Sequence, residues 1–303
     1  MAGSVVVAVF VVVVVLVSTL SSSASGSTTP FKAKPASAAL VKGVTDIPES
    51  SFKTADTGDG TVGVSSELDE TTGQAALKSN GLPELMYVGA EGCPYCAAAR
   101  WPMIIALSRF GTFKGLGIIK SSPVDSWSNT NTWTFLNATY TSKYLTFDPT
   151  EEMSNVPCPS TPVKGCGVDQ SWYDLQTPTK QVANIVKKYD TCSYFPDSGS
   201  PCLGGGIPFM DWAGKYVSSG GWYQPTVINP DSTPKQGKSY SWSQIEKFLT
   251  VPGSGEGQTI LAAANIYSAL ICDITGNSDA AVCGTTEVKN ANKLIKAQQA
   301  VKK

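Results

Sequence analysis

The feature that most constrains this chain is a pair of cysteines at C-x-x-C spacing, Cys93 and Cys96, just after a short apolar run. The run at 85–88 predicts a buried strand, and the alanine-rich stretch after it predicts a helix from Cys93 to about Phe110. The first turn of a helix has N–H groups without partners and the positive end of the helix dipole, so it favours a thiolate. We therefore expect Cys93 to be the nucleophile of low pKa and Cys96 to be the resolving thiol.

Three neighbours of the dithiol have expected supporting roles. Pro94 suits the first helical turn, because its missing N–H has no intrahelical partner to lose. Glu91 precedes Cys93 by two residues and is a candidate acceptor for the proton of Cys96. Tyr95 is expected to be exposed by its position, where it would contact the substrate or tune the redox poise.

The chain contains no histidine among its 303 residues. This excludes Ser-His and Cys-His nucleophilic pairs and histidine-ligated metal sites, and no cofactor or metal is expected. Thiol chemistry would therefore depend on the cysteines, the helix dipole, carboxylates and water. The formal net charge of −1 gives no electrostatic reason to expect nucleic acid as a partner.

The other six cysteines fall into three couples that are close in sequence, and each couple encloses residues typical of tight loops. An even number of cysteines in an exported chain indicates disulfides. The favoured pairings are Cys158–Cys166, Cys192–Cys202 and Cys272–Cys283. Other connectivities stay open. A four-thiolate zinc site is the alternative, although none of these six has the short C-x-x-C spacing.

The N-terminal region contains an unbroken apolar run from Val5 to Val17. Its length suits the core of a signal peptide better than a spanning helix. No Lys or Arg precedes it and the cleavage pattern is not clear, so residues 1–20 are expected to be a signal peptide or a membrane anchor. Either places the rest outside the cytoplasm, secreted or membrane-anchored. The Ser/Thr-rich residues 21–44 predict a flexible linker.

Residues 45–285 are expected to form one α/β domain, with an insertion at about 150–206 that carries two of the cysteine couples. A glycine run then leads to Ile207 and Pro208. Proline cannot donate to a sheet ladder, so Pro208 is expected at the start of a strand. Residues 286–303 predict a C-terminal helix or tail.

The order of these elements resembles the thioredoxin-like superfamily: a strand, a C-x-x-C helix, a strand, an inserted helical region, an Ile-Pro strand, a hairpin and a helix. The resemblance implies a central mixed sheet flanked by helices, with a disulfide-stapled helical insertion and a C-terminal helical extension. It also implies that the peptide bond between Ile207 and Pro208 is cis and that Pro208 lies beside Cys93.

Three longer runs are similar to an exported and uncharacterised family, the domain of unknown function 929 (DUF929) family. They are YVGAEGCPYCAAARWPMIIALSRFGTF, TWTFLNATYTSKYLTF and IPFMDWAGKY. The similarity covers roughly residues 45–285. This family has no established activity, so the resemblance implies location and fold more than function.

The expected function is thiol–disulfide exchange outside the cytoplasm, in the direction of disulfide formation or isomerisation. Cys93 would attack, Cys96 would resolve the mixed disulfide, and Pro208 would shape the peptide-binding surface. The expected partners are cysteine-containing exported proteins or a membrane redox partner. Two alternatives remain: a binding or structural protein in which Cys93–Cys96 is an inert disulfide, and a reductase fed by a membrane electron donor.

Overall fold

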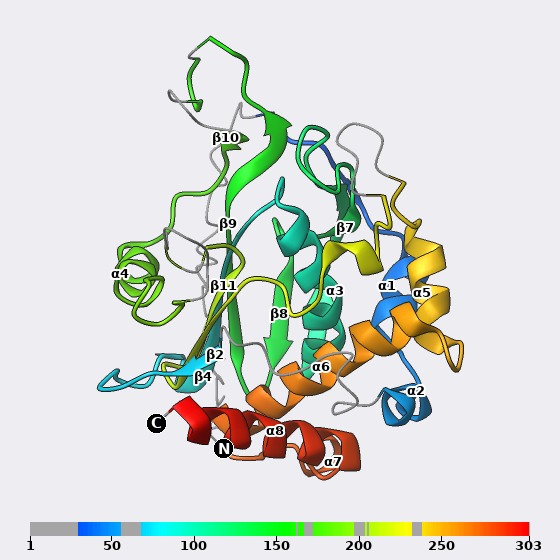
Figure 1. Ribbon diagram of the computed structural model, residues 1–303, viewed down its shortest axis with the longest axis vertical. Helices are drawn as coiled ribbons and strands as arrows, with labels where there is room; N and C mark the ends of the chain where they lie inside the picture. Colours follow the sequence, from blue (N-terminus) through cyan, green and yellow to red (C-terminus); the bar gives the residue numbers. More distant parts are fainter. Residues whose placement is uncertain are drawn as a thin grey trace, which may run out of the picture.

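The computed structural model describes residues 30–55, 68–161, 163–166, 172–196, 204, 206–231 and 238–302. The predicted signal peptide or anchor at 1–20 lies outside these residues. The described part is a mixed α/β fold, in which a central sheet has helices on both faces (Figure 1).

The central sheet is mixed and has seven strands within the described part of the chain. These strands are β2 (Leu68–Glu70), β3 (Lys78–Ser79), β4 (Leu82–Ala90), β9 (Thr146–Pro157), β10 (Trp172–Asp174), β11 (Phe209–Trp212) and β12 (Tyr216–Ser219). Their order is β10-β9-β4-β11-β12-β2, and β3 pairs with β4. β4 is parallel to β9 and antiparallel to β11, and β11 forms an antiparallel hairpin with β12.

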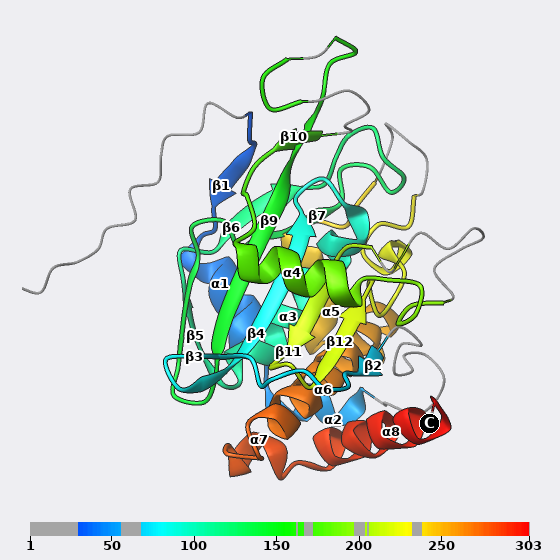
Figure 2. The ribbon, with the colours of Figure 1, turned by 90° about the vertical axis from the view of Figure 1, so that its left-hand side faces the viewer.

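The helices surround this sheet. They are α1 (Ala38–Thr45), α2 (Glu49–Thr54), α3 (Pro94–Ser108), α4 (Lys180–Tyr189), the 3-10 helix η1 (Pro225–Val227), α5 (Trp242–Thr250), α6 (Gly255–Ile274), α7 (Ala280–Cys283) and α8 (Thr286–Lys302). Figure 2 shows α4 in front of the sheet and α3 and α6 behind it. The C-terminal helix α8 packs against α6, so the helical extension is part of the same fold.

β4 lies in the middle of the sheet and contains the strand predicted at 85–88. Successive side chains of a strand point to opposite faces, and here both faces are covered. Leu85 and Tyr87 join the large core that includes Trp101 of α3, whereas Met86 and Val88 pack with residues of α4. This explains why the run is continuously apolar. Because β4 ends at Ala90, the sheet determines where the dithiol helix α3 begins.

One helix of the described residues, α6, is long and apolar enough to cross a membrane. In this fold 83% of its most apolar stretch is buried. It packs against α3, α5 and α8, and its composition is therefore that of a central core helix.

Residues 30–44, the described part of the predicted flexible linker at 21–44, are ordered into a strand and a helix. A second sheet has the order β1-β6-β7, and its strands are β1 (Ala33–Pro35), β6 (Gly117–Lys120) and β7 (Asn131–Thr134). β1 pairs with β6, and α1 follows with Ser37 as its N-cap and Val44 fully buried. The composition does not predict this strand, because β1 is stabilised by backbone pairing with β6. A separate pair, β5 (Gly111–Lys114) and β8 (Thr139–Ser142), is antiparallel.

The predicted insertion at about 150–206 also has a different boundary. Its first residues belong to β9, whose parallel pairing with β4 extends from Thr146 to Met153. Beyond this strand, the described residues form a loop that projects at the top of Figure 1, the strand β10, which pairs with β9 at the edge of the central sheet, and α4.

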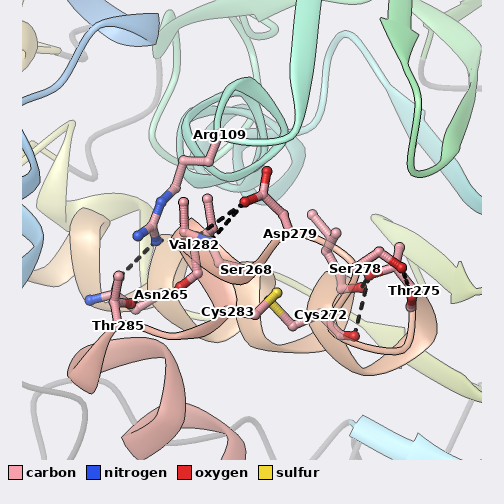
Figure 3. Close-up of a disulfide and its surroundings, with 12 residues drawn as sticks. Arg109, Asn265, Ser268, Cys272, Thr275, Ser278, Asp279, Val282, Cys283 and Thr285 are labelled. Atoms are coloured by element: carbon pink, nitrogen blue, oxygen red, sulfur yellow. Dashed lines mark hydrogen bonds between the residues drawn. A yellow bond between two sulfur atoms is a disulfide. The ribbon is translucent and has the colours of Figure 1, made fainter.

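Two of the three predicted disulfides are present, Cys158–Cys166 and Cys272–Cys283. The third predicted pair, Cys192–Cys202, includes Cys202, which lies outside the described residues. Figure 3 shows the Cys272–Cys283 disulfide, which joins the last turn of the core helix α6 to α7. Disulfides of this kind are typical of proteins that fold in an oxidising environment.

Removal of the Cys272–Cys283 disulfide should destabilise the fold. The bridge joins residues 11 apart in sequence, and opening such a loop costs about 2–3 kcal/mol through the greater entropy of the unfolded chain. Urea unfolding of Cys272→Ala/Cys283→Ala should show this decrease in the free energy of unfolding. A reductant should lower the stability of the wild type by more than that of the variant, which keeps Cys158–Cys166. Equal stability of both proteins in the oxidised state would contradict the prediction.

Candidate active site

The dithiol lies where β4 leaves the sheet and α3 begins. Cys93 is the N-cap residue of α3, with extended backbone angles (φ −74°, ψ 126°), and Pro94 occupies the first turn. The sulfur of Cys93 accepts a hydrogen bond from the backbone N–H of Cys96 at 3.3 Å. Both thiols are free, and Cys93 is 7% exposed whereas Cys96 is fully buried. Both cysteines are therefore buried, and Cys93 is the one that keeps a small accessible fraction.

This geometry separates the acidities of the two thiols. The pKa of Cys93 is lowered, chiefly by its hydrogen bond with the Cys96 side chain and also by the N–H groups of Cys96 and Tyr95 and the charge of Arg100; burial partly opposes these effects. The pKa of Cys96 is raised well above the ordinary value by burial and by the neighbouring Cys93. The sulfur that forms a thiolate more readily is therefore the one nearer the surface, which is the arrangement a nucleophile requires.

Ile207 and Pro208 lie next to the dithiol. The peptide bond between them is cis, and the Cys93 thiol lies 3.8 Å from the carbonyl oxygen of Ile207. Pro208 precedes β11, whose first residue, Phe209, is opposite Val88 of β4. Since the proline stands before the first residue of the strand, its missing N–H costs the ladder nothing. The pairing of β11 with β4 thus brings two segments 114 residues apart in sequence into contact.

Tyr95 does not have the exposure that its position predicts. Its side chain is half-buried, with the ring edge-to-face against Trp127 at a centroid distance of 5.8 Å. Its hydroxyl donates a hydrogen bond to Oε1 of Gln224 at 3.0 Å. The loop at 121–130 and the segment before η1 therefore fold over the first turn of α3 and cover much of this ring.

A buried ion pair lies beneath the dithiol. Arg100 follows Cys96 by four residues on α3, so it lies one turn further along the same helix face. Its guanidinium binds both carboxylate oxygens of Glu151, with Nε–Oε1 3.0 Å and Nη2–Oε2 2.6 Å. Nη2 also donates to the carbonyl of Ala90 at 3.1 Å and approaches Oε2 of Glu91 at 3.2 Å. Arg100, Glu91 and Glu151 are all fully buried.

Glu91 therefore belongs to a charged cluster in the interior. Burial raises its pKa to about 8, helped by the negative charge of Glu151 and opposed by Arg100 and by a hydrogen bond from the Thr134 hydroxyl. A carboxyl group of this kind exchanges its proton near neutral pH. Sequence reasoning found Glu91 but missed Arg100 and Glu151. The available signal was an arginine in a helix otherwise made of alanine and large apolar residues, which suggests a charge with a buried partner.

An aromatic side chain closes the other side of the dithiol loop. Trp172 of β10 packs so tightly on Gly92 that a Cβ at this position would lie 2.6 Å from the indole ring. Glycine is thus required here for close approach. The neighbouring loop is also tied to this position, because the N–H of Ser122 donates to the carbonyl of Gly92 at 2.9 Å.

Fold and site together define a mixed α/β protein with a free dithiol at a helix start that abuts the central sheet. The family model described as Domain of unknown function (DUF929) matches residues 71–273, and the chain belongs to this family. The match includes the dithiol and Pro208 and is shorter than the range of 45–285 expected from the resemblance. No curated protein and no solved structure matches the chain.

The two thiols should differ strongly in reactivity. In the reduced protein near neutral pH, iodoacetamide should modify Cys93 at least about tenfold faster than Cys96, since Cys93 has the lower pKa and keeps a small accessible fraction (7%) whereas Cys96 has none. The rate at Cys93 should rise with pH until its thiolate is fully formed, at a lower pH than for an ordinary thiol. Peptide mapping by mass spectrometry measures both rates, and Cys93→Ser isolates Cys96. Equal labelling of the two cysteines would contradict this assignment.

Glu91 should make the stability of the reduced protein depend on pH. Its folded pKa of about 8 lies above the ordinary 4.5, so the protonated carboxyl stabilises the fold at low pH and this contribution is lost as the pH rises through about 8. Urea unfolding at several pH values should show a shallower decline for Glu91→Gln than for the wild type.

Glu246 of α5 provides a matched comparison, because burial raises its pKa only to about 7. Glu246→Gln should therefore make the decline of the free energy of unfolding shallower only below about pH 7. Between about pH 7 and 8 its decline should equal that of the wild type. If Glu91→Gln left the entire profile as in the wild type, Glu91 would not have the raised pKa.

Proposed function

We propose that this protein is an extracytoplasmic thiol–disulfide oxidoreductase that uses the Cys93–Cys96 dithiol. The observation that carries the proposal is the asymmetry at the start of α3. Cys93 keeps a 7% accessible fraction and its pKa is lowered by hydrogen bonding at the helix start, whereas Cys96 is fully buried and its backbone N–H donates to the Cys93 sulfur. A disulfide with a purely structural purpose has little reason to close so small a loop, because a disulfide stabilises less as the closed loop becomes shorter.

The exchange has two steps. In the reductive direction the Cys93 thiolate attacks one sulfur of a substrate disulfide, the substrate S–S bond breaks, and the leaving thiolate takes up a proton. Cys96 then loses its proton and attacks the Cys93 sulfur, which releases the second substrate thiol and leaves Cys93–Cys96 oxidised. Substrate oxidation is the reverse sequence, in which the two electrons of a substrate dithiol pass to the Cys93–Cys96 disulfide.

Glu91 is the proposed acceptor for the proton of Cys96. Deprotonation of a buried thiol of raised pKa needs a nearby group that can take the proton and return it. The pKa of about 8 suits Glu91 to this task, and Arg100 and Thr134 hold its carboxyl group in place. Arg100 also favours negative charge on both cysteine sulfurs.

The residues that frame the dithiol have proposed roles in substrate positioning. The Ile207 carbonyl, close to the Cys93 sulfur, is available to an extended substrate chain once the thiol is engaged. Pro208 presents no N–H that would compete for that chain. Pro94 supports the helix start, and the half-buried ring of Tyr95 forms part of the adjoining surface.

We further propose that the dithiol unit is thioredoxin-like. Support comes from the order of elements, in which β4 and α3 are followed by the parallel strand β9, the helix α4 and the antiparallel hairpin β11–β12. The contact between the Ile-Pro segment and Cys93 is a second, independent support. The C-x-x-C motif at the junction of strand and helix is the third.

The proposed direction is disulfide formation or isomerisation, on cysteine-containing exported proteins or in exchange with a membrane redox partner. The two structural disulfides support this direction, because such bonds persist in oxidising compartments. In such a compartment a dithiol is re-oxidised readily and can donate its disulfide to new chains.

Two assays on the purified chain test the proposal: insulin reduction with dithiothreitol, and oxidation of a dithiol peptide. Wild type should accelerate at least one reaction, and Cys93→Ser should reduce the rate by at least about 100-fold, to background. Cys96→Ser should accumulate a mixed disulfide because the resolving thiol is missing. Cys272→Ala/Cys283→Ala is the control and should retain the rate at low temperature.

Known disulfide oxidases have reduction potentials as high as about −120 mV, and thioredoxin, a reductase, has about −270 mV. A potential of the Cys93–Cys96 pair near the first value would favour an oxidase, and one near the second value a reductase. If wild type and Cys93→Ser were equally inactive in both assays, the enzyme function would be rejected in favour of a binding or structural role.

A further inference from the structure

A cavity of about 350 Å³ lies beside the dithiol loop, in the second sheet. Its walls come from β1 and the residue before it, from β6, from the loop that follows β6, from the end of β9 and from the start of α5. Its volume falls in the range of ligand-binding pockets.

Three lysines line this cavity: Lys32, Lys34 and Lys120. Ala33 of β1 pairs with Ile119 of β6. Lys32, the residue before β1, therefore lies opposite Lys120, the last residue of β6, and Lys34 lies on the same face of the sheet as Lys32. Like charges in this position repel one another. No ion-pair partner of these lysines occurs among the described residues, and no Asp or Glu lines the cavity. The site therefore has an uncompensated positive charge.

Asn155 fixes the backbone that carries two of these cations. Its side-chain amide donates to the carbonyl oxygens of Lys32 (3.3 Å) and Lys120 (3.0 Å), and its carbonyl accepts from the N–H of Lys32 (3.2 Å). Asn155 is only 6% exposed. The buried amide from β9 thus holds the backbone of Lys32 and Lys120 side by side, and the lysine side chains that extend from it are exposed.

Part of the wall is apolar. Ile118 and Trp242 line the cavity together with Pro123 and Pro157. The indole of Trp242 is held in place because its Nε1 donates to the carbonyl of Thr132 at 2.7 Å. A ligand that fills the cavity therefore needs an apolar group next to its negative charges.

The loop at 121–130 forms a common wall between this cavity and the dithiol. Ser121 and Pro123 line the cavity, while the N–H of Ser122 between them binds the carbonyl of Gly92, next to Cys93. Further along the same loop, Trp127 packs on the ring of Tyr95. A chain that engages Cys93 is therefore within a short distance of the basic cavity.

We propose that this cavity binds an acidic segment of the substrate polypeptide, with carboxylates at the three lysines and an apolar side chain against Ile118 and Trp242. The identity of the occupant as substrate rests on the function proposed above. We favour a polypeptide as the occupant because the loop at 121–130 borders both sites, so that one chain can reach both the cavity and the dithiol. The second contact then selects disulfides or thiols whose flanking sequence is acidic.

Binding of a short fluorescein-labelled peptide of alternating glutamate and leucine, without cysteine, to the full chain tests the site by fluorescence anisotropy. Binding should be saturable, should weaken with salt, and should be at least about tenfold tighter than for the same peptide with lysine in place of glutamate. Lys34→Glu/Lys120→Glu should weaken it at least about tenfold.

The matched control is Lys180→Glu/Lys188→Glu. These two lysines of α4 line a separate cavity, on the other face of the central sheet, and Nζ of Lys188 lies 4.6 Å from the centre of the Tyr189 ring. This variant should bind the acidic peptide as wild type does. Equal loss in both variants would overturn the assignment, because the peptide would then respond only to overall charge. Tighter binding to phosphatidylserine vesicles or to citrate than to the peptide would also overturn it.

A cysteine added to the peptide separates this proposal from the function proposed above. Wild type in the disulfide form should react with the acidic peptide thiol at least about tenfold faster than with the lysine version, and Lys34→Glu/Lys120→Glu should abolish the preference. Peptide binding with no exchange would reject the redox function and leave a binding site. Exchange without preference would reject the docking role and leave the redox function.

Discussion

The arrangement of this protein depends on a positive charge that cannot be left unpaired in its interior. Arg100 is fully buried, and removal of an ion from water costs on the order of several kcal/mol unless other groups replace the water. Glu151 contributes two contacts from β9 and Ala90 contributes its carbonyl from β4. Because these partners belong to two adjacent strands, they hold α3 at one rotation and one height against the sheet, and with it the dithiol.

The same placement explains why the two cysteines behave differently. The helix start supplies hydrogen bonds to Cys93, and the packing of α3 on the sheet buries Cys96. The first effect is local and lowers a pKa, whereas the second is tertiary and raises one. The loop at 121–130 contacts the dithiol loop and also lines the basic cavity, so the two share one structural element.

Local patterns predicted much of the fold. The strand within β4, the start of α3 directly after Cys93 and the start of a strand directly after Pro208 all follow from apolar runs, from the chemistry of helix ends and from the missing N–H of proline. The errors have a common cause. β1, inside the predicted linker, is stabilised by pairing with β6, and Tyr95 is covered by Trp127 from a distant loop. Neither partner can be recognised from the composition of the segment itself.

The sequence by itself determined a dithiol at a helix start, an interior strand before it and the absence of histidine, because each depends on residue type and short spacing. Only the tertiary structure decided which groups surround the sulfurs. Arg100 and Glu151 are 51 residues apart, and Cys93 and Ile207 are 114 apart. The contacts within each pair depend on the parallel pairing of β4 with β9 and the antiparallel pairing of β4 with β11, which bring remote residues to one end of the sheet.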